Sequence, residues 1–295
     1  MGANVRTPTN PPPGWWPSRD SVSSAADQGG LADLVEASSP LVPVLAAAGQ
    51  RFLRPLHVQV VGRPGVGRDT MARALRERLA LTVTGPGEDS RAAADADLWL
   101  HVLTGPPRRA DRELLSSLPA DRVIVVLGKA DTHPDWEAAV DVAKRSSTQL
   151  GLPVHAVSQL LACADLDAAE FTALARLAAD RPEMPSMAGR FLVGAPGSEE
   201  RLLRQGLLRR IDAYGISTAL RLIAEGSPEA ADADALNRAL HTRSGVPQLG
   251  SAFGDRVGRV RFWREVEIHA ELERAAARGC DRENAERLLA TRGAR

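Results

Sequence analysis

The sequence predicts an α/β fold with a mostly parallel sheet, followed by an α-helical domain. From Pro55 to about Asp180, five short apolar segments alternate with segments of helical periodicity, which is the pattern of strands joined by crossover helices. Most of the apolar segments are continuous rather than alternating, as expected for strands that are buried on both faces. Beyond residue 185 the strand pattern stops, and apolar residues recur at helical spacing to the end of the chain.

The expected strands and helices of the first half follow one another closely. The strands are predicted at 56–61, 79–84, 97–103, 122–128 and 153–158, and the intervening helices at 68–79, 109–118 and 135–151. In the second half, helices are expected at 197–226, 232–245, 254–279 and 281–292.

Four regions are expected along the chain. Residues 1–30 are rich in Pro, Ser and Gly and poor in aliphatic side chains, so they are predicted to be a disordered tail. Residues 31–54 have helical spacing interrupted by Pro40 and Pro43, which predicts a broken lead-in helix. An α/β domain is expected at 55–182 and a helical bundle at 190–295.

Composition limits the classes of partner. The chain has 295 residues, 44% of them hydrophobic, which is enough for two modest domains with packed cores. Its 37 basic residues equal its 37 acidic residues, so no overall field attracts nucleic acid or anionic lipid, and no nucleic-acid partner is expected.

Other features favour a cytoplasmic protein. No apolar run approaches the roughly 18 residues that span a bilayer, and the N-terminus lacks the pattern of a signal peptide. The two cysteines, Cys163 and Cys280, are far apart and lack metal-ligand spacing. Lys129 and Lys144 are the only lysines among the 37 basic residues, a usage that resembles that of GC-rich, for example actinobacterial, genomes.

A glycine-rich segment follows the first expected strand. Residues 62–70, GRPGVGRDT, have the outline of a phosphate-binding loop, with Gly62, Gly65 and Gly67 between a strand and a helix. Such a loop needs glycines so that backbone N–H groups can surround phosphate oxygens at a helix N-terminus. However, Arg68 stands in the lysine position and Asp69 in the hydroxyl position, with Thr70 one residue later. An ordinary glycine turn is the alternative interpretation.

A second motif follows the fourth expected strand. Gly128-Lys129-Ala130-Asp131 resembles the Asn-Lys-x-Asp guanine-specificity motif of GTPases without its asparagine. That resemblance implies that Asp131 accepts hydrogen bonds from the guanine N1 and N2 groups, and that the Lys129 stem packs across the base and the phosphate loop. A chance Lys-x-Asp in a solvated turn is the alternative.

Two weaker likenesses occur in the same chain order. Ala156 to Gln159, including Ser158, resembles the base-contacting Ser-Ala-Lys/Leu loop. Thr84 and Gly87 occupy the places of an Asp-x-x-Gly motif, so the aspartate that associates with magnesium is missing.

Together these motifs resemble the translation-factor-like (TRAFAC) class of P-loop GTPases over residues 56–180, with almost every motif altered. The spaced leucines and arginines of the second half are similar to the helical region of actinobacterial dynamin-like GTPases. The resemblance implies a P-loop NTPase-like sheet, GTP or GDP as ligand and Mg²⁺ as its companion ion.

The alterations predict a protein without GTP turnover. The lysine, the magnesium ligand, the switch I segment and the acid are all absent, so we expect no catalytic residue. The predicted function is that of a non-hydrolysing partner or regulator of a competent, homologous GTPase. The alternative is a GTP-binding protein or GTPase that uses Arg68 on phosphate and Asp69, Thr70 or Asp97 around a metal, although Asp97 is expected to cap the start of its strand.

Membrane contact through the helical half is a third hypothesis. In the helix predicted at 256–278, Val257, Val260, Ile268 and Leu272 share one face, while Phe262 and Val266 point the opposite way. Apolar groups on two sides favour a helix buried in a bundle over one that lies on lipid.

Overall fold

The computed structural model describes residues 21–88, 96–180, 183–185 and 188–290. The chain forms two compact units, and each is described by itself. Unit 2 comprises His57–Ala252, and unit 1 combines Met1–Leu56 with Phe253–Arg295.

Unit 2 is built on a five-stranded sheet in which every neighbouring pair of strands is parallel, in the order β2-β1-β3-β4-β5. The α/β prediction with a parallel sheet is therefore confirmed, and each of the five expected segments contains a strand. The strands are β1 (His57–Val61), β2 (Thr82–Thr84), β3 (Leu98–Leu103), β4 (Val123–Leu127) and β5 (Val154–Ala156).

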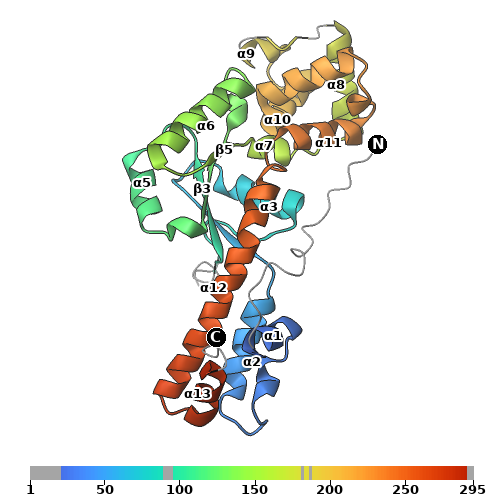
Figure 1. Ribbon diagram of the computed structural model, residues 1–295. Helices are drawn as coiled ribbons and strands as arrows, with labels where there is room; N and C mark the ends of the chain where they lie inside the picture. The colour runs from blue at the N-terminus through green and yellow to red at the C-terminus, as the bar shows by residue number, and fades with distance from the viewer. Residues whose placement is uncertain (1–20, 89–95, 181–182, 186–187, 291–295) are drawn as a thin grey trace. The chain divides into compact units, whose positions relative to one another are not determined.

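Helices lie on both faces of this sheet, as Figure 1 shows, with α5 and α6 on one face and α3 and α7 on the other. The sheet extends from β1 in two directions. On one side α3 connects β1 to β2, and on the other side α5 connects β3 to β4 and α6 connects β4 to β5. Because parallel crossovers are right-handed, the two directions place their helices on opposite faces. These helices are α3 (Arg68–Leu79), α5 (Arg109–Ser116), α6 (Trp136–Leu150) and the short α7 (Gln159–Ala162).

The central strands form the core of the sheet. All five residues of β4 are buried, as are all residues of β3 except Trp99, which is half-buried. Leu103, Val125 and Leu127 pack with Ala139 and Ala143 of α6. This burial on both faces explains why the sequences of these strands are continuously apolar rather than alternating.

The helices that follow the sheet belong to the same unit. Leu161 of α7 and Leu174 of α8 share one apolar cluster with Ile216 of α10 and Leu240 of α11. The expected boundary lay between an α/β domain at 55–182 and a bundle at 190–295. The compact unit instead extends to Ala252, because α10 and α11 complete the core of the α/β unit. The helices are α8 (Ala168–Asp180), α9 (Ala188–Phe191), α10 (Glu199–Ala224) and α11 (Ala233–Arg243).

One helix contains a backbone break. Within α10, Asp212 has φ 56° and ψ −178°, a conformation that costs a residue other than glycine about 1–3 kcal/mol. The Asp212 carboxylate accepts a hydrogen bond from Ala213 N at 2.6 Å, which satisfies one of the amides released by the break. Short 3₁₀ turns join other elements at η2 (Ala120–Arg122), η3 (Ala130–Thr132) and η4 (Pro228–Ala230).

Unit 1 is helical and combines the two ends of the chain. Val22, Leu45, Ile268 and Leu288, from four different helices, share its apolar cluster. The elements are α1 (Ser21–Gln28), η1 (Leu31–Leu34), α2 (Val42–Leu53), the part of α12 (Leu249–Ala277) from Phe253 onwards, and α13 (Arg282–Ala290).

Two expectations are corrected in this unit. Residues 21–28 of the expected disordered tail form α1, because Val22 and Ala26, one turn apart, are fully buried; residues 1–20 lie outside the described residues. In α12, Ile268 and Leu272 are buried as expected, but Phe262 is 54% exposed. The expectation of burial on both sides is thus wrong for the second face, which also includes exposed Val266.

Among the described residues, no helix has the length and apolar character needed to cross a membrane.

Candidate functional site

The glycine loop lies where the order of the sheet changes direction. β1 is followed in the chain by β2 on one side, while β3 lies on its other side. In open α/β sheets, ligands bind beyond the carboxyl ends of the strands at such a switch point. Residues 62–67 connect the end of β1 to the start of α3, so the loop occupies this place.

The three glycines have a backbone shape that other residues rarely adopt. Gly62, Gly65 and Gly67 have φ values of 140°, 83° and 89°. A Cβ at Gly62 would lie 2.8 Å from the Val102 carbonyl oxygen of β3, so this position also requires the absence of a side chain.

The amides of the loop have no acceptor within the described part of the chain. Among the described residues, none accepts a hydrogen bond from the backbone N–H groups from Gly65 to Thr70. The last of these groups belong to the first turn of α3, where a helix leaves its N–H groups unsatisfied and favours negative charge. A turn with successive free N–H groups can surround an anion.

Lys129 lies across this loop. Its backbone is left-handed, with φ 57°, and its Nζ donates a hydrogen bond to the Gly65 carbonyl oxygen at 2.9 Å. The structure thus brings together two of the sequence motifs that are 64 residues apart in the chain.

Asp131 and Ser158 meet beside Lys129. Asp131 is 7% exposed and Ser158 is fully buried. Burial raises the pKa of the Asp131 carboxyl, and the Ser158 hydroxyl acts against this shift. The Asp131 Oδ1 atom accepts no hydrogen bond from any described residue. A buried acceptor without a donor is costly, so this atom is suited to a ligand that supplies N–H groups.

Ser158 also caps a helix. Its Oγ accepts a hydrogen bond from Leu161 N at 3.1 Å, which makes it the N-cap of α7. The next residue, Gln159, is buried and contacts both Val66 in the loop and Lys129. Sequence reasoning assigned no role to the Gln159 side chain.

A buried ionic cluster flanks the loop on the α5 side, and it was not predicted. Arg63 Nε donates to both Asp111 carboxylate oxygens, at 3.0 and 3.1 Å, and Arg108 N donates to Asp111 Oδ2 at 2.9 Å. Fully buried His101 on β3 has its Nε2 3.4 Å from Asp111 Oδ1. Burial lowers the pKa of His101, against the opposing effect of Asp111. The only sequence signal was an acid in the first turn of a helix.

The residues at the start of α3 are accessible. Asp69 is exposed, whereas Arg68 and Thr70 are half-buried. Within the part of the chain that the structure describes, Arg68 makes no hydrogen bond or ion pair. Its guanidinium is therefore available to an anion at the loop.

Of the residues considered for a metal, Asp69 and Thr70 lie in the first turn of α3, whereas Asp97 lies away from the loop. Thr84 Oγ1 pairs with His57 Nε2 of β1 at 2.7 Å. Asp97 caps the start of β3 by accepting a hydrogen bond from His57 N at 2.8 Å, at the opposite end of β1 from the loop. The described residues contain no group of three or more His, Cys, Asp and Glu side chains with the arrangement of a metal site. Thr84 and Asp97 are therefore engaged with His57 of β1 rather than with the loop.

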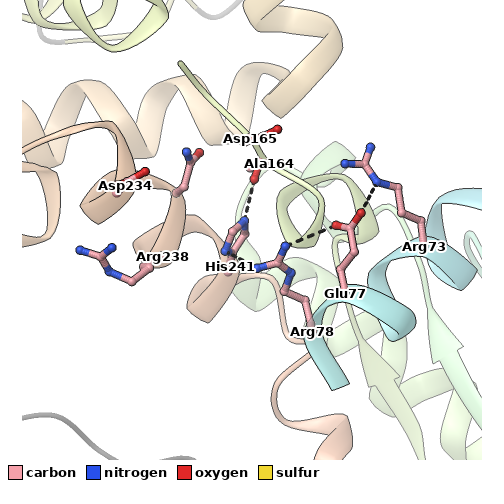
Figure 2. A pocket seen from close by; sticks show the side chains of 9 residues that line it. Arg73, Glu77, Arg78, Ala164, Asp165, Asp234, Arg238 and His241 are labelled. Carbon is pink, nitrogen blue, oxygen red and sulfur yellow. Dashed lines mark hydrogen bonds and ion pairs between the residues drawn. The ribbon is translucent and has the colours of Figure 1, made fainter. Parts of the chain in front are cut away.

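A cavity of about 370 Å³ lies elsewhere in unit 2. It is lined by the second half of α3 and by α11, rather than by the loop. Figure 2 shows Arg73 and Arg78 directed at Glu77, with Arg78 also beside His241. The His241 Nε2 lies 2.7 Å from the Ala164 carbonyl oxygen, and burial lowers the pKa of this histidine.

The ion pairs of this cavity neutralise much of its charge from within. Glu77 contacts both arginines, and Arg78 meets the remaining ring nitrogen of His241. The cavity is therefore not assigned as the functional site.

Comparison of the chain with protein-family models and with curated proteins found no match.

Proposed function

We propose that unit 2 is a degenerate P-loop GTPase domain, similar to those of dynamin-like GTPases, and that the protein acts without GTP hydrolysis as the partner of a competent, homologous GTPase. The observation that carries this proposal is the hydrogen bond from Lys129 Nζ to the Gly65 carbonyl. It joins the Lys-x-Asp turn to the glycine loop, which is the relation that the resemblance implies for these two motifs.

The position of the motifs supports the proposal. The loop follows β1, the Lys-x-Asp turn follows β4, and Ser158 follows β5, all at the carboxyl edge of one parallel sheet. A phosphate group at the free loop amides and a base at Asp131 would belong to one nucleotide. Ionised Asp131 would accept from the guanine N1–H and N2–H groups, whereas adenine offers a different edge.

The absence of hydrolysis follows from the groups at the loop. Asp69 brings a negative charge to the position where a hydroxyl would bind magnesium, and Thr84 is engaged with His57. Phosphoryl transfer depends on a cation that neutralises charge between the terminal phosphates. We therefore expect no turnover with Mg²⁺.

Titration calorimetry with GTP, GDP and ATP tests the nucleotide assignment. We expect guanine nucleotides to bind more tightly than ATP, and Asp131→Asn to weaken GDP binding by about tenfold to a hundredfold, since hydrogen bonds to charged groups contribute about 1.5–3 kcal/mol. Asp141→Asn, on the exposed side of α6, is the control and should leave the affinity unchanged. Equal affinity for ATP and GTP would contradict the assignment of Lys-x-Asp as a guanine-specificity motif.

A turnover assay separates the main proposal from its alternative. The free Arg68 guanidinium favours the alternative in which non-standard ligands support GTP hydrolysis. Hydrolysis at a rate typical of GTPases that disappears in Arg68→Ala would establish that alternative and refute a non-hydrolysing protein.

The partner is supported by the second face of α12. Phe262 on this face is 54% exposed, and Val266 is 39% exposed. Stable interfaces commonly bury about 1,200 Å² or more and have apolar centres. Affinity capture from native cells with residues 21–295, which keep α1, and with the full chain should recover the same GTPase. Loss of the GTPase in Phe262→Ser with retained folding would support this face, and its absence from both captures would refute the partner role.

A further inference from the structure

The Gln159 carboxamide lies in a slot between two glycines. A Cβ at Gly67 would lie 2.5 Å from Gln159 Nε2, and a Cβ at Gly128 would lie 3.0 Å from Gln159 Oε1. Gln159 is 3% exposed, so its amide is enclosed by the protein. Any side chain at Gly67 or Gly128 would thus have to displace this amide.

Both ends of the amide bond to the backbone. Gln159 Nε2 donates to the Val66 carbonyl oxygen at 3.1 Å, and Gln159 Oε1 accepts from Lys129 N at 2.8 Å. One side chain therefore joins the glycine loop to the turn that contains Lys129 and Asp131. Since the loop and the turn follow different strands, this contact fixes their separation.

The contact also determines the direction of a loop amide. In a trans peptide the C=O and N–H groups point in opposite directions. When Gln159 holds the Val66 carbonyl, the Gly67 N–H of the same peptide points away from Gln159. Lys129 Nζ acts in the same way on the Gly65 carbonyl, and so on the Val66 N–H. These are two of the N–H groups that have no acceptor among the described residues.

Gly128 stands in the place of the asparagine that the Lys-x-Asp resemblance leads one to expect. Gly128 is not among the glycines with positive φ, so its backbone can accommodate an L-residue. Its Cβ would point towards the Gln159 amide, and Val102 Cγ1 would be 3.0 Å away. An amide side chain at 128 and the side chain of Gln159 thus compete for one space.

We propose that Gln159 is a positioning residue that supplies, from the loop after β5, the carboxamide missing at position 128, and that it orients the Gly67 amide for an anionic ligand. The orientation of the amide is a property of the protein by itself. Its use for nucleotide phosphate rests on the function proposed above.

The test combines a deletion of the amide with its relocation. We would measure hydrogen exchange of the full chain, without nucleotide, at the Met71 amide, which donates to the Gly67 carbonyl oxygen and thus reports on the loop, and in peptides from β3 and α6. Exchange at Met71 is called loop exchange below. In Gln159→Ala, loop exchange should accelerate by about tenfold relative to the other peptides, as expected for the loss of a net hydrogen bond. In Gly128→Asn/Gln159→Ala, loop exchange should return most of the way to that of the original protein.

Two single variants complete the design. Gln159→Glu keeps an acceptor for Lys129 N but has no donor for Val66, so it should retain the slow exchange of the Lys129 amide and lose that of the loop. Gly128→Asn alone should accelerate exchange, because both amides compete for the slot. If Gln159→Ala leaves loop exchange unchanged, or if the double variant is no better than Gln159→Ala, the proposal is wrong.

GDP titration of the same variants provides the second readout. We expect Gln159→Ala to weaken GDP binding and the double variant to restore it. Absence of GDP binding in the original protein, together with the expected exchange pattern, would refute the nucleotide function while retaining the role of Gln159 in orienting the loop.

Discussion

Replacement of Asp111 by alanine should destabilise unit 2 by about 3–4 kcal/mol. The carboxylate is fully buried and accepts from the Arg63 guanidinium and from Arg108 N. A hydrogen bond to a charged group contributes about 1.5–3 kcal/mol, and loss of a helix-capping contact costs about 1 kcal/mol. Removal of one partner from a buried pair has costs of about this size because the other charge remains without compensation.

Thermal and chemical unfolding measure this change, with hydrogen exchange of β3 and α5 peptides to identify the unit that is affected. For a domain of roughly 200 residues, 1 kcal/mol shifts Tm by about 2–4 °C, so a decrease of about 10 °C is expected. Arg109→Ala is the matched control, because its side chain is 92% exposed and pairs only with the next turn of the same helix. If Asp111→Ala lowers the unfolding free energy by less than about 1 kcal/mol, the buried contacts of Asp111 do not stabilise unit 2 as argued.

Two further predictions concern the same end of the sheet. Burial lowers the pKa of His101, so as the pH falls the unfolded chain takes up a proton at this histidine before the folded chain does. The contribution of neutral His101 to the unfolding free energy is therefore complete above about pH 6.5 and is lost as the pH falls towards the folded pKa. His101→Asn should therefore flatten the dependence of the unfolding free energy between pH 5 and 7, and an unchanged slope would contradict the burial argument. Gly62→Ala should lower the unfolding free energy by more than about 3 kcal/mol, since its Cβ would lie 2.8 Å from a backbone oxygen. Gly87→Ala also has positive φ but has open space around its Cβ, so it should lower the unfolding free energy by only about 1 kcal/mol. Equal losses in the two unfolding curves would refute this ranking.

The sheet was predictable because its signal is local. Each buried parallel strand is a short apolar segment, and the helix predicted at 68–79 is observed at Arg68–Leu79. The grouping of helices was less predictable, because periodicity shows that a face is apolar but does not show which segment covers it. Trp136 of α6 meets Tyr214 of α10 with ring centroids 6.2 Å apart, although the two residues are far apart in the sequence.

In unit 1, too, the sequence does not show which segments pack together. Val22 and Leu288 share one core although they lie near opposite ends of the chain. The sequence SVSSAADQ of α1 contains few apolar residues, and its helix depends on tertiary burial of Val22 and Ala26. No local pattern predicts such a contact.

The candidate site was predictable in its motifs but not in its supports. The glycines could be recognised from their place between a strand and a helix, and Lys129 and Asp131 from their resemblance to a GTPase motif at a strand end. Gln159 could not, because its partner Val66 is 93 residues away and a glutamine after a serine has no distinctive pattern.

The shape of the loop depends on side chains outside its first helical turn. Arg63 fixes one flank through Asp111, while Lys129 and Gln159 hold two successive carbonyls on the other. None of these contacts uses the side chains of Arg68 or Asp69. Under the proposed function, a change of residue at those two positions would alter the phosphate-binding side chains without releasing the backbone of the loop. A loop that needed only to turn the chain could satisfy its carbonyls with water at the surface. The enclosed contacts instead fix the direction of the Val66 and Gly67 N–H groups, and backbone N–H groups held in this way can surround an anion.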